Sequence, residues 1–302
     1  MTAATPATPA PATPAAGSPS RPRPSAMRRA ARRVGGGEAL LGFLILGLLV
    51  LIAIGAPVLA PHDPESMVTT QVMGGPSLDH LFGSDASGRD VLSRVLYAFR
   101  VSLTVAAGSV LLSFLVGVPI GLVAGFRGGR VDSLLMRPLD LLLALPALLL
   151  AISLIAIVGP GAGVTMLAIA LIYVPIVARV VRGSVMVTKG LPYVDGARAR
   201  GVSEMGLLVR HVLPNSMGPA LIQGTILLGF AIQIEAALSF LGLGAQPPTP
   251  SLGVMLNEGR DVLTLAPWAE VFPGLAIAIT VLAFTLIGDG LRRRLDPRGM
   301  AR

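Results

Sequence analysis

Long apolar runs separated by short polar segments dominate the chain. The runs cover residues 39–61, 101–126, 139–187, 216–244 and 271–288. About 20 apolar residues span a bilayer, so the third run is too long for one crossing. A Gly/Pro-rich turn at 159–163 divides it and predicts a hairpin of two helices. Pro119 lies inside the second run and predicts a break there. The pattern predicts an all-α polytopic membrane protein with six transmembrane helices.

The composition supports a membrane protein and limits its chemistry. Of the 302 residues, 53% are hydrophobic and 13% are charged, whereas soluble domains carry about 25% charged residues. The absence of cysteine excludes disulfides and cysteine-ligated metals. The three histidines, His62, His80 and His211, are far apart in the sequence. We therefore expect no metal site.

Both ends of the chain are polar. Residues 1–26 repeat Ala, Thr and Pro and cannot bury enough apolar surface to fold. We expect residues 1–37 to form a disordered, basic N-terminal segment. The next apolar run is too long for the core of a signal peptide and lacks a convincing cleavage site. We therefore expect residues 38–61 to be a retained first transmembrane helix and residues 292–302 to be a basic tail.

Charge predicts the orientation of the spans. Six spans place both termini on one side, and basic residues gather in the termini and in the loops after the second and fourth spans. By the positive-inside rule, both termini and the loop at 189–215 are cytoplasmic. Residues 62–98 then form an extracytoplasmic or interfacial segment, and residues 99–291 form a core of five helices. The basic residues outside the first segment that support this orientation are Arg127, Arg130, Arg137, Lys189, Arg198, Arg200, Arg210, Arg292, Arg293, Arg294, Arg298 and Arg302.

The segment 189–215 is a long polar interruption between two strongly apolar regions. Pro192 suits the first turn of a helix, where its missing N–H costs nothing, and Gly201 suits a helix C-terminus. Ser203 suits the N-cap of a second helix. That helix should end before Pro214, because a residue preceding proline avoids the α region. Two helices this short are unstable alone, so the unit needs a groove formed by its own membrane helices or by another protein.

This segment also carries a family resemblance. The letters DGA at 195–197, a glycine at 201 and Leu-Pro at 213–214 resemble the cytoplasmic EAA loop of ABC importer permeases. The chain departs from that pattern in having Asp-Gly for Glu-Ala and in having His211 where many members carry an apolar residue. Glycine inside the first helix costs roughly 1 kcal/mol relative to alanine. The resemblance implies that the loop docks on an ATPase and couples hydrolysis to helix movement. The coupling residues implied are Asp195, Gly196, Ala197, Gly201, Glu204, Arg210, His211, Leu213 and Pro214.

Three further segments resemble the dipeptide, oligopeptide and nickel branch of these permeases. Residues 82–94 are similar to its GTDxxGRDxxSR signature. Residues 238–256 are similar to its LSFLGLGxxPPxPxWGxML segment, with Leu252 in place of tryptophan, and the tail at 288–298 resembles that of the same branch. The candidate residues of the first signature are Gly88, Arg89 and Asp90.

Two interpretations of the GRD signature remain open. It could meet the substrate-binding protein or brace the pore. Alternatively, it is an amphipathic connector in which Asp90 and Arg94 pair on one helix face, worth a few tenths of a kcal/mol. We favour the connector.

The resemblance covers residues 38–298 and implies the second (DppC/OppC-like) permease subunit of a type I ABC importer in the bacterial inner membrane. The implied partners are a homologous permease subunit, two cytoplasmic ABC ATPases, an extracytoplasmic solute-binding protein and membrane lipids, with no nucleic acid. ATP and Mg would be used by the ATPases, and this chain would bind no cofactor. Peptides are the favoured cargo. Dipeptides, longer peptides, nickel chelates and glutathione-like compounds remain open, because in this family the binding protein usually selects the cargo.

No motif for bond-making chemistry occurs in the sequence. A Walker phosphate loop, a Gly-x-Ser-x-Gly elbow and a His-Glu-x-x-His motif are absent, so an enzyme is not expected. Charged residues near the spans are candidate functional residues, and Glu235 and Asp140 are candidates for the translocation path or for helix pairing. Gly117, Gly121 and Gly125 form a Gly-xxx-Gly ladder that favours close helix approach. The alternatives are a secondary transporter, which would show inverted repeats and ionisable relays, and a scaffold without an ATPase.

Overall fold

The computed structural model describes residues 37–67 and 72–295, and within these ranges it contains helices and connecting segments but no strand. The expectations for residues 1–36 and 296–302 lie outside the described residues. The helices are α2 (Gly37–Leu59), α3 (Val91–Arg127), α4 (Gly129–Ala144), α5 (Ala147–Val158), α6 (Ala162–Thr188), α7 (Pro192–Ala199), α8 (Glu204–Gly206), the π-helix η1 (Leu207–Val212), α9 (Leu213–Phe240), α10 (Leu252–Gly259), the 3₁₀-helix η2 (Arg260–Val262) and α11 (Trp268–Leu295).

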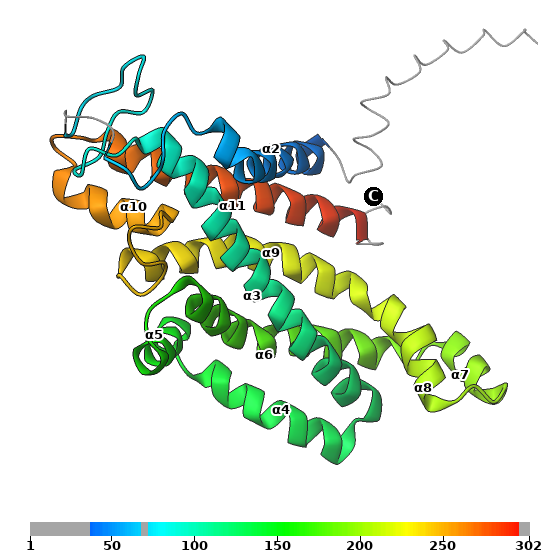
Figure 1. Cartoon of the computed structure of the whole chain (residues 1–302). Helices are drawn as coiled ribbons and strands as arrows, with labels where there is room; N and C mark the ends of the chain where they lie inside the picture. Colours follow the sequence, from blue (N-terminus) through cyan, green and yellow to red (C-terminus); the bar gives the residue numbers. More distant parts are fainter. Residues whose placement is uncertain (1–36, 68–71, 296–302) are drawn as a thin grey trace, which may run out of the picture.

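Five helical segments of the described chain are long and apolar enough to cross a membrane (Figure 1). Four of them are α2, α3, α6 and α11, and the fifth runs without interruption from Glu204 to Phe240 through α8, η1 and α9. The helices α4 and α5 pass the same test together and are bent by 93° at the break between them. Counting this bent pair as one span gives six, which agrees with the predicted all-α, six-span fold.

The central packing contact joins α3 to α6 through the predicted glycine ladder. A Cβ atom added to Gly121 would lie 2.3 Å from the carbonyl oxygen of Ala178. Gly117 and Gly125 stand similarly close to carbonyl oxygens one helical turn away on either side of that contact. Only glycine permits so close an approach of two backbones, and such contacts stabilise helix pairs in a bilayer. The ladder therefore sets the α3–α6 distance.

The predicted break at Pro119 is wrong, because α3 continues through it from Val91 to Arg127. Proline inside a helix costs about 3 kcal/mol, mainly through a lost hydrogen bond and a steric clash. In transmembrane helices neighbouring groups and small adjustments satisfy the freed carbonyl. Pro119 lies between the ladder glycines 117 and 121, where packing on α6 holds the helix together. The helix also begins at Val91, ten residues before the apolar run that predicts it.

The hairpin predicted at 159–163 is present, but its first arm differs from expectation. α5 ends at Val158 and α6 begins at Ala162, with Gly159 and Gly161 at positive φ between them. The first arm is divided again at Leu145–Pro146, and its other half, α4, extends back to Gly129. Arg130 and Arg137, which we expected in a loop, therefore lie in α4.

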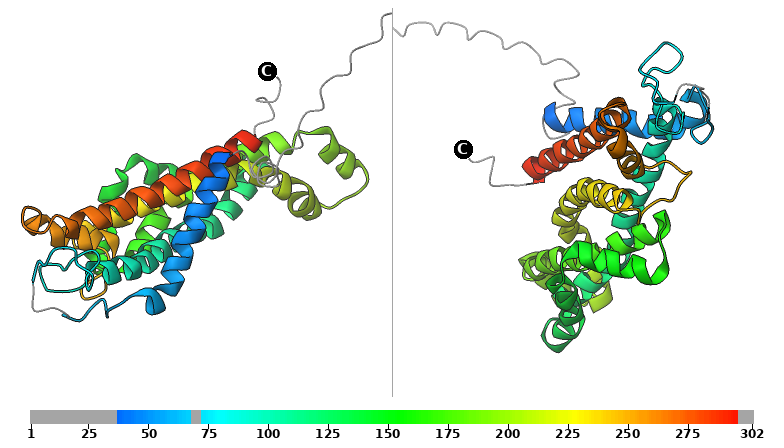
Figure 2. Two further views of the ribbon diagram at one scale, coloured as in Figure 1. Left: turned by 90° about the horizontal axis from the view of Figure 1, so that it is seen from above. Right: turned by 90° about the vertical axis from the view of Figure 1, so that its left-hand side faces the viewer.

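Polar structures occupy the two opposite ends of the molecule. The hairpin of α7 and α8 projects from one end, and the segment between α2 and α3 lies with α10 at the other (Figures 1 and 2). Glu38 at the start of α2 forms an ion pair with Arg293 near the end of α11. Both ends of the described chain therefore lie on the same side, as an even number of spans requires.

Candidate functional site

Local sequence signals shape the hairpin at 189–215 as predicted. Pro192 occupies the first turn of α7. Gly201 has a φ of 82°, and the N–H groups of Gly201 and Val202 donate to the carbonyls of Arg198 and Ala197 at 2.9 and 3.3 Å. This is the Schellman arrangement that ends a helix at glycine. Ser203 caps α8 by accepting a hydrogen bond from the N–H of Gly206.

The hairpin is anchored on its own chain. Val194 and Ala197 of α7, and Leu207 and Val212 of η1, are fully buried and belong to the main apolar cluster of the protein. α7 packs on η1, and these side chains extend the apolar cluster that contains Val185 of α6, so this part of the hairpin is closed within the subunit. Three other apolar side chains of the hairpin are left exposed by the subunit, namely Tyr193, Met205 and Val209.

The prediction that the second hairpin helix ends before Pro214 is wrong. The chain passes from α8 through η1 directly into α9, with the N–H of Leu213 donating to the carbonyl of Leu208. In a π-helix each hydrogen bond reaches one residue further back than in an α-helix. With this wider turn, the helix continues through Pro214, although Pro214 has no N–H to donate. Next to Pro214, the carbonyl of His211 accepts from Asn215 Nδ2 at 2.7 Å and from the Tyr193 hydroxyl at 3.4 Å.

The charged candidates of the hairpin form a small exposed network. Arg198 lies 3.0 Å from Asp195 and 3.5 Å from Glu204, linking the two helices across the glycine turn. Exposed pairs of this kind contribute about 0–1 kcal/mol, so they orient the hairpin more than they stabilise it. A Cβ atom added to Gly196 would meet no atom within 4 Å, and Arg210 is exposed.

Glu235 is buried among helices. It is 1% exposed, and its carboxylate accepts from the hydroxyl of Ser102 on α3 at 2.7 Å and from the hydroxyl of Ser239 at 2.8 Å. The hydroxyl of Ser102 also lies 3.4 Å from the backbone N–H of Leu252, where α10 begins. Within the subunit, this geometry fits the helix-pairing role and joins α9, α3 and α10.

Asp140 has a different environment from Glu235. It lies near the end of α4 rather than at the start of a span, and it pairs with Arg179 of α6 at 2.6 Å. Both side chains are about half exposed. A second pair, Asp132 with Arg182, joins the same two helices. Two ion pairs therefore join α4, the first half of the bent α4–α5 pair, to α6.

The GRD signature builds the start of α3 and the turn before it. Gly88 has a φ of 75°, which glycine adopts without strain. Asp90 is the N-cap of α3, and its carboxylate accepts from the N–H and the hydroxyl of Ser93 at 2.8 and 2.7 Å. The predicted pair between Asp90 and Arg94 is not formed. Arg94 turns instead toward two other carboxylates.

Those carboxylates belong to Asp85 and Glu258. Arg94 is 1% exposed, forms an ion pair with Asp85 and lies 2.7 Å from Glu258 of α10. Arg89 reaches the same two carboxylates at 2.8 and 3.0 Å. Burial opposes ionisation of Asp85, but the Arg89 N–H and the charges of Arg94 and Arg89 outweigh it, so the pKa of Asp85 lies below its usual value. These four residues, the outer ion network, brace α3 against α10.

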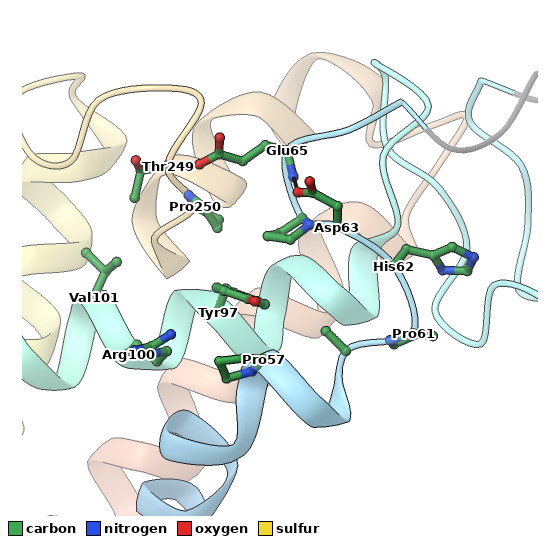
Figure 3. A pocket seen from close by; sticks show the side chains of 12 residues that line it. Pro57, Pro61, His62, Asp63, Glu65, Tyr97, Arg100, Val101, Thr249 and Pro250 are labelled. Carbon is green, nitrogen blue, oxygen red and sulfur yellow. Dashed lines mark hydrogen bonds between the residues drawn. The ribbon is translucent and has the colours of Figure 1, made fainter.

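A cavity of about 580 Å³ opens between the segment that follows α2 and the side of α3 (Figure 3). Asp63 and Glu65 lie on one rim, Tyr97 and Arg100 of α3 form the opposite wall, and Pro250 closes a third side. The ring of Tyr97 lies 5.8 Å from the guanidinium of Arg100. The cavity therefore presents acidic groups across from a basic one, outside the apolar core.

The arrangement of apolar spans, a projecting helical hairpin and a braced opposite end defines a polytopic membrane protein of the permease class. Residues 117–299 match the family model of the binding-protein-dependent transport system inner membrane component, and residues 39–76 match the N-terminal transmembrane domain of oligopeptide transport permease C. The chain belongs to this family of ABC transport permeases.

Individual relatives cover most of the chain. It is 44% identical over 250 residues to the glutathione transport system permease protein GsiD of Pectobacterium atrosepticum, covering 82% of this chain and 83% of that one. It is 42% identical over 249 residues to the dipeptide transport system permease protein DppC of Alkalihalophilus pseudofirmus, covering 82% of both chains.

The sequence did not indicate which distant residues meet at the outer end. The indole N–H of Trp268, at the start of α11, donates to the carbonyl of Ser84 at 3.0 Å. His62 and His80, which are far apart in the sequence, lie together with Asp90. The closely spaced charges of residues 85–94 are the sequence signal that could have indicated a polar cluster there.

Proposed function

We propose that this permease subunit imports peptides, with the hairpin at 189–215 receiving the movement of a cytoplasmic ATPase. The observation that carries the proposal is the uneven burial of the hairpin's apolar side chains. Residues such as Val194 and Leu207 are buried in the subunit, whereas Tyr193, Met205 and Val209 are exposed. Exposed apolar side chains on a projecting element are typical of a protein contact.

The continuous helix explains how movement would pass inward. Force applied to α8 acts on η1 and α9 without a flexible linker between them. At its far end α9 is tied to α3 and α10 through Glu235. If an ATPase docks on the hairpin in two ways, each way would favour one of two arrangements of these helices. Alternating access requires such a shift between two states.

The orientation follows from charge. The hairpin and both ends of the described chain lie on one side, and this side carries the excess of basic residues. The positive-inside rule makes that side cytoplasmic. The outer ion network and the cavity of Figure 3 then face the solute-binding protein.

The remaining components of the machine are partners. A homologous permease subunit would complete the translocation path, for which Asp140, half exposed and paired with Arg179, is a candidate residue. Two ABC ATPases would bind ATP and Mg, and this chain would bind neither. The relatives named for dipeptide and glutathione transport support a short peptide as cargo.

Replacement of Gly201 tests the coupling role. Gly201→Val places a β-branched residue at a φ of 82°, which costs of the order of 1–3 kcal/mol and distorts the turn. In proteoliposomes containing the whole transporter, we expect ATP-driven uptake to fall about tenfold or more while the subunit still inserts and the ATPases still turn over.

The matched control is Gly196→Ala in the same hairpin, where an added methyl group meets no atom within 4 Å and φ is helical. This variant should transport as well as the wild type. Uptake by Gly201→Val at the wild-type rate would refute the coupling role. Uptake without any ATPase would favour a secondary transporter instead.

A further inference from the structure

Two histidines and an aspartate meet at the outer end of the molecule. Nδ1 of His80 lies 2.9 Å from Oδ1 of Asp90, and Nδ1 of His62 lies 4.0 Å from Oδ2 of the same carboxylate. The centroids of the two imidazole rings are 4.8 Å apart. One nitrogen or oxygen atom from each residue can be chosen so that all three lie within 4.8 Å of one another.

Hydrogen bonds position these groups independently of any ligand. Oδ2 of Asp90 is held by the N–H and hydroxyl of Ser93 at the first turn of α3. The same hydroxyl accepts from the backbone N–H of His62 at 3.1 Å. His80 is fixed by its own backbone N–H, which donates to the hydroxyl of Ser77 at 3.1 Å. The cluster is therefore built by local structure around the N-cap of α3.

The cluster is also incomplete as a set of hydrogen bonds. Among the described residues, Nδ1 of His62 is buried without a hydrogen-bond partner. Asp90 is fully buried, and within the described ranges its only ion-pair partners are these two histidines, with no lysine or arginine. A buried carboxylate needs a compensating positive charge. An unpartnered nitrogen and an unbalanced carboxylate facing the same point favour a cation between them.

We propose that His62, His80 and Asp90 bind a divalent transition-metal ion, with Zn²⁺ as the ion best suited to them. Two imidazole nitrogens and one carboxylate oxygen form a donor set that Zn²⁺ accepts at about 2.0–2.2 Å. The ion would take the place of the proton that His80 shares with Asp90, and the ring would keep its proton on Nε2. Ser93 would orient the carboxylate ligand, as outer-shell groups do in metal sites.

The site joins three separate parts of the outer segment. His62 follows α2, His80 lies in the long connection, and Asp90 begins α3. A bound ion would fasten this connection to α3 at its N-terminus. Because both histidine side chains are partly exposed, at 24% and 16%, three protein ligands leave a fourth position open to water or to an external donor atom.

Zinc titration of the full chain tests the proposal. The protein would be purified with an affinity tag that lacks histidine, stripped with a chelator and titrated with ZnCl₂, and bound zinc would be measured by elemental analysis. We expect one equivalent in the wild type. We expect His62→Gln and His80→Gln each to weaken binding by about 100-fold or more, since loss of an outer-shell group alone costs 10–100-fold.

His211→Gln is the matched control, because it removes the third histidine of the chain from the hairpin at the opposite end. It should bind zinc like the wild type. Thermal unfolding with and without zinc separates ligation from folding. Zinc should raise the Tm of the wild type and of His211→Gln, but not of the two site variants, each variant being compared with its own metal-free Tm. Absence of stoichiometric zinc in the wild type, or equal binding by the site variants, would overturn the proposal.

Discussion

At the scale of single residues, Arg94 shows how the outer end is held together. Its side chain is almost fully buried and reaches Asp85 in the connection before α3 and Glu258 in α10. Glu258 lies 164 residues away in the sequence. Arg94 therefore links two parts of the chain that are distant in the sequence. The two carboxylates balance its charge together with that of Arg89, which contacts both of them.

Removal of this charge should destabilise the subunit. We expect Arg94→Met to lower the free energy of unfolding by about 3 kcal/mol, because it leaves the buried carboxylate of Asp85 and the partly buried one of Glu258 to share Arg89 alone. The measurement is denaturant unfolding in detergent micelles, followed by the fluorescence of Trp268. Arg260→Met is the control, since its pair with Asp261 is exposed and should contribute less than about 1 kcal/mol. Equal effects of the two changes would show that burial of the network is unimportant.

The pKa of Asp85 makes this stabilisation depend on pH. Its pKa in the folded state lies below the usual value, which is about 3.9 for an unfolded aspartate. The contribution is complete above that value and is lost as the pH falls through the lower, folded pKa. Unfolding midpoints of the wild type should therefore decline below about pH 4 more steeply than those of Asp85→Asn. Asp261→Asn should follow the wild type, and a wild-type slope for Asp85→Asn would contradict the assignment.

At the scale of elements, the contact of α3 with α6 depends on glycine. A methyl group on Gly121 would meet the backbone of α6 at 2.3 Å, and neither helix can move away without losing the contacts above and below. We expect Gly121→Ala to cost about 1–3 kcal/mol, as overpacked cores do. Gly183→Ala on α6 has no atom within 4 Å and should stabilise the helix by up to about 1 kcal/mol. Unfolding midpoints that rank in the reverse order would contradict the role of the ladder.

Helix ends were predictable where the signal was local. Pro192, Gly201 and Ser203 occupy the positions that their backbone preferences demand, because a cap depends on residues within one turn. The same reasoning failed at Pro119 and Pro214. There the preference of one residue is outweighed by packing on α6 or accommodated by a π-helical turn, and neither effect is visible in a local stretch of sequence.

At the scale of the whole molecule, the number of spans and the family followed from the sequence, since hydrophobic length and motif order are both linear features. The contacts at the end of the molecule that holds α10 did not follow from the sequence. The outer ion network joins residues 85–94 to residue 258, and the histidine cluster joins residues 62, 80 and 90. Such contacts depend on how loops return over the helix ends, which no periodicity records. The hairpin at 189–215 is intermediate. Its helix ends depend on neighbouring residues and were predictable, whereas its burial in the main apolar cluster involves residues far apart in the sequence.

The uninterrupted helix from Glu204 to Phe240 sets the reach of the hairpin. Its 37 residues extend about 55 Å at about 1.5 Å per residue, whereas the hydrocarbon layer is about 30 Å thick and the bilayer with its headgroups about 40–45 Å. Two charged side chains of this helix, Glu204 and Arg210, lie in its first turns and are exposed. If the helix stood along the bilayer normal with its surplus length on that side, the hairpin would lie about 10 Å beyond the lipid headgroups, within reach of a water-soluble protein.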